Sequence, residues 1–228
     1  MGIEERNNKN LPTRHFHPAS EKRVSIQILK AVDKLFARVY HNVEVRNPLN
    51  LPKTGPAIVI CNHTSGLDPM LLQSCCSRLI IWMVAKEYYE LKFLKPFFKT
   101  LEAIPVDRSA RDTGAVRQAL RALSEGRVLG VFPEGKISPT RGTLLPFQPG
   151  VAQMAIKTRS PIYPAYLDGT QCGITDITPA YLRRQRAIIR FGEPIDLFSA
   201  NTQSAATKPS GQELSDQLQA TVAALSRK

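Results

Sequence analysis

The sequence lacks a hydrophobic run long enough to cross a membrane. Its most apolar stretch, residues 79–85 (LIIWMVA), is much shorter than the roughly 20 residues that a spanning helix needs. Residues 1–18 are polar and show none of the apolar core of a signal peptide. The four cysteines form no Cys-x-x-Cys unit, which favours reduced thiols in the cytosol. We therefore expect a cytoplasmic protein that does not span a bilayer by itself.

Several patterns of well-known catalytic sites are also absent. The sequence contains no G-x-S-x-G, H-E-x-x-H or G-x-G-x-x-G motif, and two of its four histidines lie in the polar N-terminus. Residues 130–136 (GVFPEGK) have the spacing of a phosphate loop. However, Pro133 removes a backbone N–H that such a loop uses, and Ile137 replaces its Ser or Thr. We expect neither a metal site nor nucleotide hydrolysis.

Acidic residues are scarce compared with basic ones. The chain has 31 Lys and Arg against 19 Asp and Glu, which gives a formal net charge of +12. Such a charge indicates an anionic partner, which could be nucleic acid, an anionic membrane or a phosphorylated substrate. The arginine-rich segment 183–190 is not accompanied by a helix-turn-helix or an RNA-binding sheet signature, so we expect no nucleic acid partner.

Short apolar segments alternate with helical patterns through most of the chain. Strands are predicted at 57–61, 79–85, 103–106, 128–132, 162–167 and 187–191, and helices near 69–78, 111–124, 148–158 and 213–226. This alternation predicts one α/β domain, residues 43–200, whose sheet is covered by helices. Residues 1–19 form a polar tail, and 201–228 a linker and C-terminal helix. Prolines within residues 160–169 suggest an edge strand or a lined cleft.

Residues 20–42 contain the strongest amphipathic helix. One face carries Val24, Ile28, Val32, Leu35, Phe36 and Val39, and another carries Lys30, Lys34 and Arg38. Two interpretations are open. The apolar face packs on the domain and the basic face meets water, or the helix lies on an anionic membrane with its basic residues at the headgroups. Residues 91–99 (LKFLKPFFK) pose the same choice.

A histidine and an aspartate follow the first predicted strand. The strand ends at Cys61, His63 lies in the next loop, and Asp68 precedes Pro69 where a helix begins. From the loop, the imidazole can fold back to Asp68, which would hold one ring nitrogen and leave the other free to take a proton. The alternative is that Asp68 only caps the helix, with Pro69 in its first turn.

Two more strands run into polar residues. The strand at 103–106 is followed by Asp107-Arg108, where a guanidinium suits a phosphate or makes a local ion pair. The strand at 128–132 is followed by Pro133-Glu134-Gly135, which could also be an ordinary turn. Open α/β sheets place their sites at strand ends, so these residues are candidates for one site.

In this order and spacing, the blocks resemble the glycerolipid acyltransferase family that includes the 1-acylglycerol-3-phosphate acyltransferases. The resemblance runs from Ala57 to Phe191 and covers His63–Asp68 (H-x-x-x-x-D), Ile104–Arg108, Phe132–Gly135 and Pro161–Pro164. It implies a mixed central sheet flanked by helices, with His63 and Asp68 as catalytic residues. It also implies an acceptor phosphate site formed by Arg108, Glu134, Gly135 and Lys136. Lys136 and Ile137 stand where the family usually has Thr-Arg.

The resemblance implies transfer of a fatty acyl group from acyl-CoA or acyl-acyl carrier protein to lysophosphatidate, making phosphatidate. No cofactor beyond this co-substrate is implied, and the enzyme would work on the cytoplasmic face of an anionic membrane. The backbone N–H groups of residues 65–68 would stabilise the oxyanion. The alternatives are an acyltransferase for another lysolipid or an acylated amino acid, and a non-catalytic basic protein that binds lipid or nucleic acid.

Overall fold

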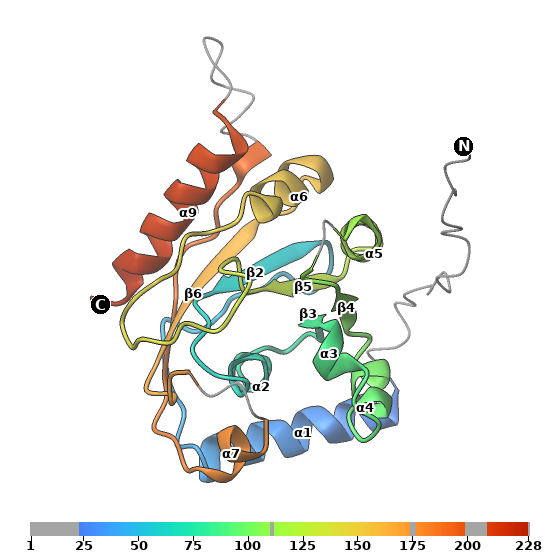
Figure 1. The fold of residues 1–228 in the computed structure, drawn as a ribbon, viewed down its shortest axis with the longest axis vertical. Coiled ribbons are helices and arrows are strands. Elements are labelled where there is room, and N and C mark those ends of the chain that lie inside the picture. The colour runs from blue at the N-terminus through green and yellow to red at the C-terminus, as the bar shows by residue number, and fades with distance from the viewer. Residues whose placement is uncertain (1–22, 110–111, 174–176, 199–208, 228) are drawn as a thin grey trace, which may run out of the picture.

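A seven-stranded sheet forms the centre of the computed structural model, which describes residues 23–109, 112–173, 177–198 and 209–227 (Figure 1). The strands lie in the order β1 (Glu44–Arg46), β7 (Ile188–Phe191), β6 (Ile162–Asp168), β2 (Ala57–Cys61), β5 (Val128–Val131), β3 (Ile80–Ala85) and β4 (Ile104–Val106). β6 and β7 pair antiparallel, and every other neighbouring pair is parallel. The sheet is therefore mixed, as the resemblance implied.

The six predicted strands are confirmed to within one residue at each end. The edge strand β1 was not predicted, because its three residues are all exposed and form no apolar run. The prediction that residues 160–169 form an edge strand is wrong, since β6 lies between β7 and β2. Pro164 is tolerated there because the pairing is irregular. Between the Ile162–Ile195 bridge and the Ala165–Phe191 pair, two residues of one chain segment face three of the other.

Helices cover both faces of the sheet (Figure 1). On one face lie α5 (Thr113–Ser124), α6 (Gly150–Thr158) and α9 (Gly211–Leu225), and on the other lie α1 (Val24–Val39), α2 (Asp68–Ser74) and α7 (Ile177–Leu182). α9 begins with a capping box between Ser210 and Glu213 and buries Leu218 and Val222 in the core. The C-terminal helix is therefore part of the folded domain. The predicted tail, 1–19, and residues 201–208 lie outside the described residues.

Two short helices, α3 (Lys86–Tyr89) and α4 (Lys95–Thr100), follow β3 and were not predicted. Each spans six residues or fewer, which is too short for a helical period to stand out in the sequence. α4 lies beside one end of α1 (Figure 1), and both helices line one cavity. No helix in the described part of the chain is long and apolar enough to cross a membrane.

The apolar face of α1 points outward. Leu35 is 65% exposed, and Val24, Ile28, Val32 and Val39 are exposed to a similar degree. Hence the interpretation in which this face packs on the domain is wrong. The basic residues also differ from expectation, because the Lys30 ammonium donates a hydrogen bond to the backbone carbonyl of Ser77.

Gly130 lets an aromatic ring approach the centre of the sheet. A Cβ at this position would lie 2.5 Å from Cε3 of Trp82 and 2.6 Å from Cγ2 of Ile80, so any larger residue would collide. Gly130 lies within β5, which agrees with the rejection of a phosphate loop at residues 130–136. The close approach brings Trp82 beside Phe132, at the end of β5.

Candidate active site

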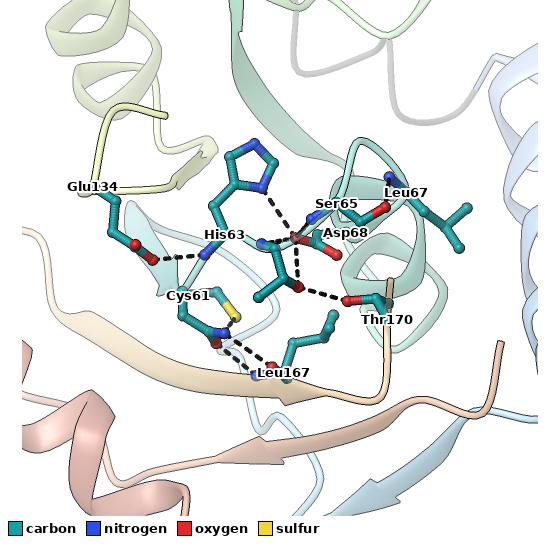
Figure 2. A network of polar contacts seen from close by, with 10 residues as sticks. Cys61, His63, Ser65, Leu67, Asp68, Glu134, Leu167 and Thr170 are labelled. Atoms are coloured by element: carbon teal, nitrogen blue, oxygen red, sulfur yellow. Dashed lines mark hydrogen bonds and ion pairs between the residues drawn. The ribbon is translucent and has the colours of Figure 1, made fainter. Parts of the chain in front are cut away.

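The loop that carries His63 leaves the carboxyl end of β2, where the parallel strands β5 and β6 flank it. Asn62 fixes this loop to β6. Its side-chain amide donates to the carbonyl of Leu167 at 2.9 Å, and its side-chain oxygen accepts the Leu167 N–H at 2.7 Å. Because both bonds are buried, they hold the next residue, His63, at one defined place beyond the carboxyl end of β2 (Figure 2).

The carboxylate of Asp68 turns back from the start of α2 to the His63 loop (Figure 2). Its Oδ2 atom lies 3.0 Å from Nδ1 of His63 and accepts the backbone N–H groups of Thr64 at 2.7 Å and Ser65 at 2.8 Å. Asp68 is fully buried, whereas the His63 side chain is 16% exposed. The carboxylate therefore holds the Nδ1 proton and leaves the second ring nitrogen of His63 facing away from it.

The alternative role of Asp68 as the cap of α2 is wrong, since Leu67 is the N-cap and no side chain caps this helix.

Three of the backbone N–H groups that were expected to stabilise the oxyanion are already hydrogen-bonded within the loop. Ser65 N–H is bound to Asp68, Leu67 N–H to the Ser65 hydroxyl, and Asp68 N–H to the Ser65 carbonyl. These amides stabilise the turn and are not available to a substrate.

Glu134 holds the backbone of His63. Its Oε1 atom accepts the His63 N–H at 2.7 Å, and its Oε2 atom accepts the Leu145 N–H at 2.8 Å. On the other side, the Ser138 N–H donates to the His63 carbonyl at 2.7 Å. Burial raises the pKa of Glu134, while the hydrogen bonds from the Leu145 and His63 N–H groups oppose the increase. Glu134 of the third sequence block and Ser138, which lies beyond that block, therefore hold the backbone of His63 from both sides.

Two aromatic rings support the imidazole. The His63 ring stacks on Phe132 with centroids 3.9 Å apart, and Phe132 stacks on Trp82 at 4.9 Å. The sequence placed Phe132 in the third block, but it predicted no role for either ring. The only signal was that Phe132 directly precedes Pro133-Glu134, at the end of an apolar strand. The stack limits rotation of the imidazole about its side-chain bonds.

Arg108, Gly135 and Lys136 lie together beside this histidine, on the wall of two adjoining cavities. The Arg108 guanidinium makes an ion pair with Glu87 and lies 3.5 Å from the Gly135 carbonyl. Gly135 has a φ of +72°, a backbone conformation that favours glycine. The structure thus brings three of the predicted phosphate-binding residues to one place.

Lys86 and Glu87 were missed by the sequence reasoning. They follow β3 directly, and because Ala85 of β3 is paired with Val106 of β4, they lie next to Asp107-Arg108. The Lys86 ammonium is 4.0 Å from Oδ2 of Asp107. A lysine immediately after a predicted strand was the available signal. The parallel pairing of β3 with β4, which places this lysine beside Asp107, could not be predicted from the sequence.

A largely apolar cavity of about 900 Å³ extends from His63 between β3, α4 and α1. Its wall includes Leu29, Phe36, Met70, Trp82, Leu94, Phe97, Phe98, Val106 and Phe132. A second cavity of about 600 Å³ adjoins it and is lined by more polar residues, among them Asp107, Asp112 and Gln148. The site therefore combines an apolar cavity with a more polar one, and Arg108 and Lys136 line both of them.

All four cysteines are free thiols. Cys61 is nearest the histidine in sequence, and burial raises its pKa far above the ordinary value, which keeps it protonated and unreactive. Among the residues that the structure describes, no group of three or more His, Cys, Asp or Glu could hold a metal ion.

A family model described as Acyltransferase matches residues 42–168. The 1-acyl-sn-glycerol-3-phosphate acyltransferase of Bacillus subtilis is 27% identical over 141 residues, which cover 61% of this chain and 69% of the relative. The enzyme of the same name from Cocos nucifera is 32% identical over 117 residues, which are 50% of this chain and 38% of the relative. In structure, the fold is similar to the 1-acyl-sn-glycerophosphate (LPA) acyltransferase PlsC from Thermotoga maritima. The TM-score is 0.66 at 23% identity, covering 86% of this chain and 77% of that one.

Proposed function

Since the chain belongs to the Acyltransferase family, we propose that it transfers a fatty acyl group from acyl-CoA or acyl-acyl carrier protein to the free hydroxyl of 1-acylglycerol-3-phosphate, making phosphatidate for phospholipid synthesis. One observation carries the proposal. The His63–Asp68 pair opens on an apolar cavity of about 900 Å³ with Arg108 and Lys136 on its wall. Matched relatives named 1-acyl-sn-glycerol-3-phosphate acyltransferases support the same acceptor.

The proposed reaction is a direct transfer. The free ring nitrogen of His63 removes the proton of the acceptor hydroxyl as that oxygen attacks the thioester carbonyl carbon. The new C–O bond forms, the C–S bond breaks, and the leaving thiolate takes the proton from the imidazolium. Asp68, 3.0 Å from Nδ1, stabilises the imidazolium while it exists.

The two substrates divide between the two cavities. The apolar cavity suits the acyl chain of the donor, because each CH₂ group that is buried there contributes about 0.8 kcal/mol to binding. The acceptor phosphate would bind Arg108 and Lys136 beside Gly135, where the more polar cavity begins. Both oxygens of Glu134 already accept backbone N–H groups, which favours a positioning role over contact with the acceptor.

The assignment is tested by incubating the purified protein with labelled acyl-CoA or acyl-acyl carrier protein and a panel of acceptors. The panel contains lysophosphatidate, other lysophospholipids and acylated amino acids, because Lys136-Ile137 departs from the usual Thr-Arg. We expect phosphatidate as the main product. Transfer only to an acceptor without a phosphate would contradict the acceptor assignment, and no transfer to any acceptor would contradict the function.

Arg108→Ala should raise the KM for lysophosphatidate by roughly 10- to 100-fold, because a hydrogen bond to a charged group is worth about 1.5–3 kcal/mol. The KM for acyl-CoA should change much less. Steady-state kinetics with each substrate varied in turn measure both values. Arg46→Ala is a matched control, since Arg46 also pairs with a glutamate but lies at the opposite edge of the sheet. A rise in the donor KM alone would assign Arg108 to the donor site.

We further propose that α1 and the segment before α4 dock on the cytoplasmic face of an anionic membrane. Phe93 is 95% exposed, and Ile28 and Leu35 of α1 are more than half exposed, so large apolar side chains meet water beside the acyl cavity. Lys34 and Arg38 belong to the same helix and would add attraction to anionic headgroups. Docking here would place the cavity next to the lipid that supplies the acceptor.

The variant Ile28→Ser/Leu35→Ser/Phe93→Ser should bind vesicles at least a hundredfold more weakly, because each buried side chain of this size contributes about 1.5–3 kcal/mol. Vesicle sedimentation measures this change. Val45→Ser, on the edge strand β1, is the control for an exposed apolar residue elsewhere. Lys34→Gln/Arg38→Gln should weaken binding only to anionic vesicles, by about 1 kcal/mol per residue at low salt. Undiminished sedimentation of the triple variant would refute this docking surface.

A further inference from the structure

One acidic side chain stands on the wall of the apolar cavity. Asp33 lies in the middle of α1 and lines the cavity that reaches His63. Both of its carboxylate oxygens are buried, and neither accepts a hydrogen bond from any group in the described part of the chain. A buried carboxyl group without a donor is costly, and the reaction described above does not use it.

Two polar side chains of the cavity wall, Gln73 and Lys30, are already engaged. Gln73 donates its amide N–H to the carbonyl of Arg78 at 3.0 Å, and its oxygen accepts the Ile80 N–H at 2.8 Å. Lys30, one turn before Asp33 on the same helix, donates its ammonium to the carbonyl of Ser77. Tyr181 also lines this cavity, but its hydroxyl is not bonded to Asp33, whose two oxygens have no partner in the described part of the chain. A hydroxyl on the molecule that fills the cavity would supply the missing donor.

We propose that Asp33 makes the cavity selective for acyl chains that carry a hydroxyl group along the chain, an inference that rests on the proposed acyl transfer. An unsubstituted chain would leave both carboxyl oxygens unpaired, whereas a hydroxyl would donate to one of them. A pocket built around a buried polar group rejects the analogue that lacks its partner. The apolar remainder of the wall would hold the methylene groups in either case.

The charge of this group gives the selectivity a pH dependence. Burial raises the pKa of Asp33 to about 7. Around it, burial raises the pKa of Cys75 at the end of α2 to about 11 and also raises that of Tyr181 on α7, so both keep their protons near neutral pH. Lys30, Lys34 and Arg38 are the cations on its own helix. As the pH rises through 7, the unpaired carboxylate penalises an unsubstituted chain more strongly, and preference for the hydroxylated chain increases.

The test compares acyl-CoA donors of one chain length, unsubstituted or with a hydroxyl near the thioester, in mid-chain or near the methyl end. For the wild type, kcat/KM of the best hydroxylated isomer should exceed that of the unsubstituted chain by roughly 10- to 100-fold. The ratio should fall to about one in Asp33→Leu, with an intermediate value in Asp33→Asn. Phe36→Leu, which reshapes the same wall without changing its polarity, should leave the ratio unchanged. Taking a ratio cancels effects that are common to both donors.

Displacement of a fluorescent fatty acid by the free hydroxylated and unsubstituted acids gives a second readout that needs no turnover. If no acyl transfer occurs, the proposed function fails and the binding preference still decides the role of Asp33. Equal ratios in the wild type and Asp33→Leu, by kinetics or by displacement, overturn the inference. So does a wild-type preference for the unsubstituted chain.

Discussion

His63→Ala should lower kcat by about 10²–10⁴-fold, because the acceptor hydroxyl would lose the group that takes its proton. The structure leaves the second ring nitrogen of His63, Nε2, available for this proton, since Asp68 holds only Nδ1 and His63 lines the cavity. The loop should keep its shape without the imidazole. Its backbone is held by Glu134 and by the Ser138 N–H, and neither bond involves the side chain.

Single-turnover kinetics with labelled acyl-CoA measure the loss, and vesicle binding and thermal melting show whether the rest of the molecule is intact. His41→Ala is the matched control. His41 has a buried imidazole that accepts the Gln185 N–H at 3.2 Å near the end of α1. This control should lose stability and keep most of its turnover per folded molecule. Wild-type rates from His63→Ala would remove this residue from the mechanism.

Asp68→Asn should lower kcat by about 10²–10⁴-fold with little loss of stability. The amide oxygen can take the place of Oδ2 and still accept the Thr64 and Ser65 N–H groups. The amide nitrogen then takes the place of Oδ1, which accepts no hydrogen bond from the residues that the structure describes. The variant therefore keeps the turn but removes the negative charge that stabilises the imidazolium.

Asp68→Ala separates the two roles of this carboxylate. This variant should lose the same activity and should also unfold at a lower urea concentration. The buried N–H groups of Thr64 and Ser65 would lose their acceptor, and each loss lowers the free energy of unfolding by about 1–3 kcal/mol. Turnover and urea unfolding of both variants provide the comparison. An asparagine variant with full activity would show that the charge of Asp68 is not required.

The sequence determined which segments form the sheet, but not how the polar residues around His63 bond to one another. β2, β5 and β6 are apolar runs bounded by proline, glycine or polar residues, so their positions were predictable. β1 was not, because its residues are exposed and it is held by pairing with β7 alone. The role of Glu134 depends on a bond to a residue 71 positions earlier, and no local pattern encodes such a contact.

Helical periodicity gave the outline of α1 but not its orientation. The spacing of Val24, Ile28 and Leu35 defines one apolar face, and the same spacing fits a buried or an exposed helix. On the inner side of the helix, Ile26 and Ala37 are buried. Because both faces contain apolar residues, only the packing against the rest of the domain could decide between the two interpretations.

The ring stack behind His63 also gives the protein an optical probe. Trp82 is the only tryptophan of the chain, and it lies on the cavity wall against Phe132, which in turn contacts the imidazole. Emission excited at the red edge of the absorption band therefore originates from this wall alone. A chain that enters the cavity displaces water next to the indole and shifts its spectrum to shorter wavelength. Occupancy can thus be followed in real time without a label, even in variants that do not turn over.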